Sequence, residues 1–195
     1  MKMIGVKSKI ASKELNNFDE KKRNDVLKQY CFYLKKHKKL ILKANQIDIL
    51  KANKIRNSMI DRLKLNDTKI NEIIKSVERI IKLKDPLNKI LASWKRPNGL
   101  IIQRVSIPIG VIGVIYESRP NVTSDVSSLC FKSGNAVILR GGSEAFYSNK
   151  MLSYLFKKSL KKKKCNQDCV QFIEKKNRNN VDYLLSKMQN YIDII

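Results

Sequence analysis

The sequence predicts an α/β protein in which amino-terminal helices precede a parallel, Rossmann-like sheet. Up to residue 96, apolar side chains recur at three- and four-residue spacing, which is the period of helices packed along one face. Beyond Trp94, short apolar runs alternate with helical stretches, as in successive β-α units. The hydrophobic content is 43% of 195 residues, which is typical of globular chains and sufficient for a core.

Two helical segments are expected in the amino-terminal part. Residues 9–52 are predicted as helix, with apolar positions along one face and lysines along the other. Lysine stems can cover apolar surface while their ammonium groups stay in water. A second helix is predicted over 68–83, preceded by capping residues at 66–68. It ends at Asp85, because the residue before Pro86 avoids the helical region.

The strand–helix alternation starts after a turn at 97–99. The 111–116 run is apolar on both faces, as expected of a strand buried in a parallel sheet. Lysines at 161–164 would end one of the helices, where its dipole favours cations. The predicted strands cover 100–106, 111–116, 136–139, 170–173 and 191–195, and the helices between them cover 121–132, the stretch after 143, and 180–188.

The cysteines indicate buried thiols rather than a metal centre. Four cysteines are scattered along the chain and His37 is the only histidine, so the paired spacing of zinc sites is absent. Reduced thiols in a cytosolic protein are the expected state. In the helix at 121–132, Cys130 shares an apolar face with Val122, Val126 and Leu129, which predicts a small core residue.

No targeting or membrane segment is apparent in the sequence. Lysines at positions 2, 7 and 9 interrupt any early apolar run, so a secretory signal is not expected. No stretch approaches the roughly 20 apolar residues that a membrane span needs. The chain is therefore predicted to be cytoplasmic.

The net charge of +24 suggests a nucleic-acid binder, but its distribution argues otherwise. Lysine outnumbers arginine 32 to 9, which codon bias in an A/T-rich genome would also produce. Residues 97–149 carry four basic and three acidic side chains, so the most organised part of the chain is almost neutral. Nucleic-acid readers usually place their basic stripe on the organised element. We interpret the lysines as a solvated surface and expect no specific nucleic-acid partner.

Polar residues follow two neighbouring predicted strands, at 117–121 and at 140–143. In open α/β sheets, ligands lie at the carboxyl ends of strands, where helix amino termini offer free N–H groups. Each of these two segments, called corners below, contains an arginine, whose guanidinium can hydrogen-bond to two phosphate oxygens at once. The pattern predicts an anion or nucleotide site, although two ordinary βα turns remain the alternative because no G-x-G-x-x-G motif is present.

One long segment carries a family resemblance. Residues 104–145, RVSIPIGVIGVIYESRPNVTSDVSSLCFKSGNAVILRGGSEA, resemble the signature region of the γ-glutamyl phosphate reductases, also called glutamate-5-semialdehyde dehydrogenases, of the aldehyde dehydrogenase superfamily. The likeness extends from about Lys9 to the final YIDII, with supporting fragments at 41–49, 58–66, 85–90 and 94–100. It implies a truncated aldehyde-dehydrogenase-type fold, with an amino-terminal helical region at 1–96 and part of an NADP-binding domain at 97–195.

The resemblance also implies a reaction, the NADPH-dependent reduction of γ-glutamyl phosphate to glutamate-5-semialdehyde in proline biosynthesis. A cysteine thiolate displaces phosphate, and the resulting thioester is then reduced. The resemblance assigns Asn121 as oxyanion donor, with a helix cap as the alternative role. It places Arg140 beside the cofactor's adenosine ribose, where its charge would suit the 2′-phosphate of NADP. The other cofactor-binding candidates are Ser118, Arg119, Pro120, Gly141, Gly142 and Ser143.

The family's nucleophilic cysteine and a glycine-rich cofactor loop correspond to positions beyond residue 195. We therefore expect this polypeptide to be inactive alone, with a second polypeptide carrying the other half, or a homo-oligomer, as candidate partners. The stretch KKKKCNQDCV at 161–170 departs from the family pattern and puts that loop in doubt. Two alternatives without catalysis are a basic nucleic-acid-binding remnant and an assembly subunit that pairs through a sheet edge or the 100–110 hairpin.

Overall fold

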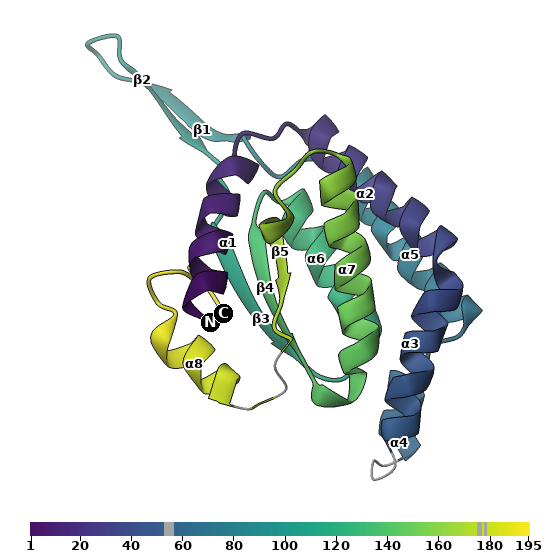
Figure 1. Cartoon of the computed structure of the whole chain (residues 1–195). Helices are drawn as coiled ribbons and strands as arrows, with labels where there is room; N and C mark the ends of the chain where they lie inside the picture. Colours follow the sequence, from purple (N-terminus) through teal and green to yellow (C-terminus); the bar gives the residue numbers. More distant parts are fainter. Residues whose placement is uncertain (53–56, 175–176, 178) are drawn as a thin grey trace.

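The structure, a computed structural model, describes residues 1–52, 57–174, 177 and 179–195 (Figure 1). Its amino-terminal part is helical, with α1 (Lys2–Leu15), α2 (Glu20–Lys36), α3 (Lys38–Lys51), α4 (Asn57–Leu63) and α5 (Asp67–Lys82). A hairpin of β1 (Ile90–Lys95) and β2 (Ile101–Val105) follows. The α/β part contains β3 (Val111–Tyr116), α6 (Pro120–Lys132), β4 (Ala136–Gly141), α7 (Phe146–Lys162), β5 (Val170–Phe172) and α8 (Asn179–Lys187), with 3₁₀ turns at Ser143–Ala145 and Gln167–Cys169.

The main sheet is parallel and has the order β3-β4-β5. The register pairs Val111 with Ala136 and Tyr116 with Gly141, so β3 and β4 end side by side. After α8 the chain crosses to the other edge of β3, where Ile194 forms a parallel bridge with Ile112. The predicted α/β class is therefore confirmed, and so is the alternation of strands and helices as far as α8. The strand predicted over 191–195 is reduced to this single bridge.

The central strand β4 is buried on both faces, and its side chains alternate between two apolar clusters. Val137 and Leu139 face the larger cluster, which also contains side chains of α2, α5, α6 and α7. Ala136 and Ile138 face the smaller cluster, together with residues of α8 and the start of α1. This two-residue period, with helices on both faces of the sheet (Figure 1), explains why the strand is apolar from Ala136 to Leu139.

The prediction of one helix over 9–52 was wrong. The segment forms parts of three helices, and the first of them already begins at Lys2. The first break is stabilised by Asp19, whose carboxylate accepts a hydrogen bond of 2.7 Å from the backbone N–H of Lys22 and so caps α2. The second break lies at His37, whose backbone leaves the helical region between α2 and α3. Each break lets the chain change direction and pack against other helices. The spacing of apolar residues does not reveal where such a change of direction occurs.

The predicted second helix is confirmed as α5. Asn66 caps it by accepting a hydrogen bond of 2.8 Å from the N–H of Lys69. Its apolar stripe is buried against α2 and α6, and consists of Ile70, Ile73, Ile74, Val77 and Ile80. The short helix α4 was not predicted.

Helix α6 lies where the sequence placed it, and Cys130 is a buried core residue as predicted, but the rest of the predicted apolar face is not fully buried. Leu129 is 46% exposed, and Val122 and Val126 are only half-buried. The fully buried face carries hydroxyl side chains instead, such as Ser124, which hydrogen-bonds to Tyr30 of α2 at 2.7 Å. Small hydroxyl residues let the helices approach closely, and the hydroxyls of Ser124 and Ser127 are hydrogen-bonded. A face with hydroxyl groups, as well as Cys130 and Phe131, therefore lies against the core.

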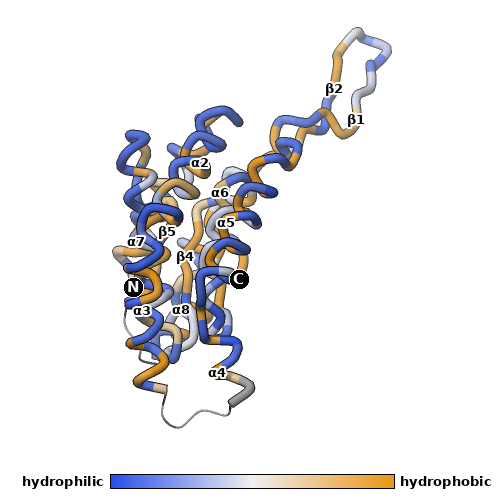
Figure 2. Tube along the Cα trace, turned by 90° about the vertical axis from the view of Figure 1, so that its right-hand side faces the viewer, coloured by the Kyte–Doolittle hydropathy of each residue, from blue (hydrophilic) through white to orange (hydrophobic). Residues whose placement is uncertain are grey.

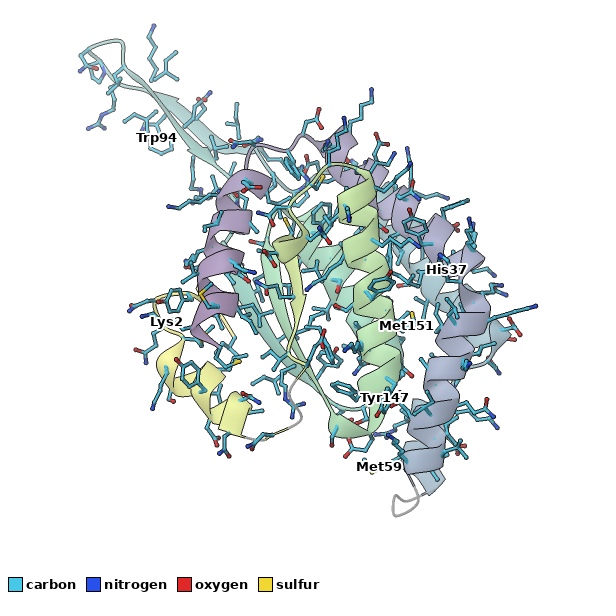
Figure 3. The ribbon with its side chains drawn as sticks, viewed as in Figure 1. Lys2, His37, Met59, Trp94, Tyr147 and Met151 are labelled. Atoms are coloured by element: carbon cyan, nitrogen blue, oxygen red, sulfur yellow. The ribbon has the colours of Figure 1, made fainter. Side chains whose placement is uncertain are left out.

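The hairpin projects from the body of the protein (Figure 1), and Trp94 lies on it, away from the sheet (Figure 3). Hydrophobic residues run along this arm (Figure 2), and Ile101 is 63% exposed. Strand β1 was not predicted. It pairs with β2 on the other side of residue 96, and α1 packs on the main sheet, so contacts cross the predicted domain boundary. A division into domains at residue 96 therefore stays a prediction. Within the described residues, no helix is long and apolar enough to cross a membrane.

Candidate functional site

The two polar corners predicted from the sequence lie at one edge of the main sheet. β3 and β4 end in register, and residues 117–119 and 142–145 follow them directly. The strand order also reverses at β3, because β4 lies on one side of it and the chain near Ile194 on the other. Such a reversal opens a crevice at the carboxyl ends of the strands, where open α/β sheets bind ligands.

The corners touch each other through Ser118. Its hydroxyl donates a hydrogen bond to the carboxylate of Glu144, and a Cβ on Gly142 would collide with this hydroxyl and lie 2.9 Å from the backbone nitrogen of Ser118. A Cβ on Gly141 would collide with the amide of Asn149. Gly142 therefore lets the two loops approach each other, and Gly141 makes room for Asn149 of α7.

A cavity of about 410 Å³ opens beside this contact. Its walls come from the end of β3, the loop after β4 and the start of α8, and include Tyr116, Arg140, Gly142, Ser143, Glu144 and Asp182. Arg140 is 8% exposed and donates a hydrogen bond to the carbonyl of Gly141. The cavity thus combines a buried cation with carboxylates, and its volume lies within the range of about 300–1,000 Å³ usual for ligand sites.

Glu144 is ionised at neutral pH. Burial raises the pKa of this carboxyl, but hydrogen bonds from the hydroxyls of Ser118 and Ser143, together with the charge of Arg140, outweigh burial and lower it overall. Nearby, burial raises the pKa of Tyr116 to about 12, so the phenol stays neutral. Its oxygen lies 2.7 Å from the hydroxyl of Thr123 on α6.

The backbone N–H groups at the amino terminus of α7, where an anion was expected to bind, already donate to a side chain of the protein. Asp48 of α3 reaches across to it, and its carboxylate accepts hydrogen bonds from the backbone N–H groups of Tyr147 at 2.9 Å and Ser148 at 2.7 Å. These N–H groups are the ones that a phosphate would use. An anion at the second corner must therefore rely on Arg140 and the 143–145 turn.

Asn121 lies in a different cavity, on the side of the loop that faces α5. This cavity measures about 330 Å³ and is lined by residues that include Arg62, Ser76, Asn121 and Asp125. The Asn121 amide donates to Asp125 at 3.3 Å, one helical turn along α6. Arg119 is the N-cap residue, and no side chain caps α6. The alternative role of Asn121 as a helix cap is therefore not what the structure shows.

The predicted residues fall into three groups. Ser118, Gly141, Gly142, Ser143 and Arg140 gather around the cavity of 410 Å³. Asn121 belongs to the cavity of 330 Å³. The other two lie apart from both cavities: Pro120 is buried as the first residue of α6, and Arg119 is exposed, with its Nε 3.6 Å from Glu117.

Sequence reasoning missed two carboxylates at the site. Glu144 stands two residues after the glycine pair Gly141-Gly142, near the end of the strand, where α/β sheets often place an acidic group for ribose hydroxyls. Asp125 stands four residues after Asn121, a spacing that puts both side chains on one face of a helix. Both signals were present in the sequence.

Comparisons with known proteins agree with the geometry. The γ-glutamyl phosphate reductase of Bartonella henselae is 43% identical over 197 residues, covering 100% of this chain and 48% of the relative. That of Thermotoga maritima is 42% identical over 183 residues, covering 93% and 44%. The chain thus spans about half the length of the curated relatives it matches. No family model matches the sequence.

Solved structures show the same fold. The crystal structure of γ-glutamyl phosphate reductase from Thermotoga maritima superposes with a TM-score of 0.94 at 41% identity, over 97% of this chain and 46% of that one. The Saccharomyces cerevisiae enzyme gives 0.89 at 28% identity, over 97% and 49%. A probable aldehyde dehydrogenase from Listeria monocytogenes gives 0.74 at 13% identity, over 99% and 40%, a likeness of fold alone.

Proposed function

Because this chain belongs to the γ-glutamyl phosphate reductase family and matches the amino-terminal part of its members, we propose that it provides the cofactor-holding part of an NADPH-dependent reductase of γ-glutamyl phosphate. The observation that carries the proposal is the contact between the loops after β3 and β4, through Ser118, Gly142 and Glu144. Two of these residues, Gly142 and Glu144, line the cavity of 410 Å³ at the point where the strand order reverses.

The residues around the cavity of 410 Å³ fit a phosphorylated dinucleotide. The guanidinium of Arg140 would pair with the 2′-phosphate. Ionised Glu144 would accept a hydrogen bond from a ribose hydroxyl, and the Ser143 hydroxyl lies beside it, 2.7 Å from Oε1. The cofactor supplies the hydride when bound. Its adenosine half would occupy this cavity between the loop and Asp182 on α8.

Asn121 would act on the substrate rather than on the cofactor. Its side chain is exposed at the first turn of α6. One of its two amide hydrogens donates to Asp125, and the other can donate to a substrate carbonyl. A donor in this position stabilises the negative oxygen that develops when the carbonyl is attacked.

None of the four cysteines in this chain suits the role of nucleophile. All four are buried. Burial raises the pKa of Cys31 and Cys130 to about 11 and that of Cys169 to about 12, and it also raises the pKa of Cys165. A reactive cysteine instead needs a lowered pKa and access to the substrate. We therefore propose that the attacking thiolate comes from outside residues 1–195.

Calorimetric titration of the folded chain with NADPH tests the proposal. We expect NADPH to bind, NADH to bind at least tenfold more weakly, and Arg140→Met to remove this preference, because only NADPH offers the 2′-phosphate. Arg104→Met on the hairpin removes the same charge away from the cavity and should leave both affinities unchanged. Assayed with NADPH and γ-glutamyl phosphate, the chain alone should show no turnover. A folded chain that binds neither nucleotide would refute the proposal.

A further inference from the structure

We propose that Asp125 binds the α-ammonium group of the substrate, so that the cavity beside Asn121 selects a glutamyl group over an acyl chain without an amino group. The inference rests on the proposed function, and it assigns a substrate-specificity role to a residue outside the predicted site. Two observations carry it: the carboxylate of Asp125 forms no ion pair in the described part of the chain, and Asn121 and Asp125 lie one helical turn apart on α6.

Two cations, Arg62 and Lys69, and two carboxylates, Glu72 and Asp125, line this cavity. The ammonium group of Lys69 donates to the backbone carbonyls of Asp61 at 2.7 Å and Lys64 at 2.8 Å. Basic residues outnumber acidic ones 41 to 17, and some acidic side chains pair with cations, such as Asp85 with Arg23 and Asp193 with Lys9. Asp125 lines the cavity and, across the described part of the chain, forms no ion pair. A partly buried carboxylate without a cation, in a strongly basic protein, is suited to receive a cation from a ligand.

Two hydrogen bonds hold this carboxylate in place. Ser76 of α5 donates to Oδ1 at 2.7 Å, and Asn121 donates to Oδ2 at 3.3 Å. Both donors are uncharged, so neither forms an ion pair with the carboxyl group, and its oxygens have lone pairs left for a further donor. An ammonium group carries three N–H donors and can bind such a carboxylate without displacing Ser76.

The spacing along α6 matches the length of the substrate. Side chains four residues apart on a helix have Cβ atoms about 5–6 Å apart. In a glutamyl group, only a short chain of carbon atoms separates the reacting carbonyl from the α-nitrogen, which is a comparable distance. With the carbonyl at Asn121, the ammonium group therefore reaches Asp125.

Arg62 completes the recognition of an amino acid. It lines the same cavity, its side chain is 55% exposed, and its guanidinium lies 3.7 Å from Glu117, which is more exposed still. This loose surface pair can open at little cost, and the planar guanidinium can then bind the α-carboxylate with two hydrogen bonds. The cavity thus offers an anion for the ammonium and a cation for the carboxylate.

The test compares L-glutamate with glutarate, which has both carboxylates but no amino group. Each is titrated into the ¹⁵N-labelled chain, and the shift of the Asn121 side-chain amide signal gives the affinity. We expect L-glutamate to bind about tenfold more tightly than glutarate, and Asp125→Asn to reduce this ratio to about one. The asparagine keeps an oxygen for Ser76, so the fold should survive; unchanged far-UV circular dichroism checks this.

Two further variants sharpen the test. Glu72→Gln removes an exposed carboxylate that lines the same cavity and should lower the ratio by about twofold, since exposed charges act weakly. The control Glu78→Gln lies on the same helix, but its carboxylate pairs with Lys35 at 2.8 Å and lies outside the cavity. It should leave the ratio unchanged.

The outcome is separable from that of the proposed function, because the titration needs no cofactor. Equal affinity of the parent chain for L-glutamate and glutarate, or a tenfold preference that persists in Asp125→Asn, would overturn the ammonium site even if NADPH binds. A glutamate preference lost in Asp125→Asn would support the site even if NADPH does not bind, and only the cofactor assignment would then fail.

Discussion

At the scale of single residues, the contact between Ser118 and Gly142 depends on the absence of one carbon atom. Any side chain at residue 142 would occupy the space that the Ser118 hydroxyl and backbone nitrogen now fill. The loop after β3 and the loop after β4 would then separate, and the wall of the cavity beside Arg140 would open.

Gly142→Ala should therefore weaken NADPH binding at least tenfold and lower the free energy of unfolding by about 1–3 kcal/mol, because a methyl group is forced into occupied space. Calorimetry and urea denaturation measure the two effects. Ser118→Gly removes the hydroxyl, so the double variant should recover part of the stability. If Gly142→Ala binds NADPH like the parent chain, the loop contact does not shape the site.

At the scale of elements, α6 joins the site to the core through an unexpected face. Its hydroxyl side chains face inward, and the aliphatic residues Val122, Val126 and Leu129 are left partly or largely exposed. The inward face also contains Phe131, which is fully buried and packs edge-on against Phe156 of α7 at 5.7 Å between ring centroids.

A pair of alanine substitutions distinguishes these faces. Leu129→Ala should lower the free energy of unfolding by less than about 1 kcal/mol, because half of the side chain is already in water. Phe131→Ala should lower it by about 3–5 kcal/mol, since it empties a packed position. Chemical denaturation of both variants gives the comparison. Equal losses would mean that Leu129 is covered in solution.

The end of α6 is fixed to α2 by a buried lysine. Lys132 donates to Glu20 at 2.6 Å and to Asn24 at 2.8 Å, and its side chain is 3% exposed. The hydrogen bond from Lys132 is the largest influence on the carboxyl of Glu20 and lowers its pKa in the folded protein. A carboxyl with a lowered pKa stabilises the fold while it is ionised.

This contribution should be complete above the pKa of Glu20 in the unfolded chain, about 4.3. It should disappear as the pH falls from there through the lower pKa of the folded state. Urea denaturation between pH 3 and pH 7 should therefore show a steeper acid loss of stability for the parent chain than for Glu20→Gln. Parallel curves would indicate that the Lys132 contact contributes nothing measurable.

At the scale of the whole molecule, the lysine-rich surface encloses a core that contains all four thiols. Cys169 is fully buried and the other three are at most 8% exposed. Burial raises the pKa of each thiol, to about 11 or above for Cys31, Cys130 and Cys169. Thiolate is the reactive form, so both access and ionisation oppose modification.

The folded chain should therefore react with a thiol reagent such as Ellman's reagent at pH 8 at least tenfold more slowly than the urea-unfolded chain, and all four thiols should react after unfolding. Free cysteine supplies the reference rate. A thiol that reacts in the folded chain as fast as free cysteine would contradict the burial described here and reopen the question of a nucleophile within this chain.

The sequence by itself determined the fold class, most strands, the helix α5 and the two corners at the ends of β3 and β4. Each of these depends on local patterns, namely apolar periodicity, turn residues and capping side chains, which act over a few neighbouring positions. The family resemblance, which the relatives confirm, also depends on such local runs.

Only the tertiary structure decided how these parts meet. It broke the predicted long helix at Asp19 and His37, turned the hydroxyl face of α6 inward, and used Asp48 to occupy the start of α7. It also separated Asn121 from Arg140 into two cavities. The reason is physical: a buried polar atom needs a partner, and that partner can come from any part of the chain, as the 100 residues between Asp48 and Ser148 illustrate.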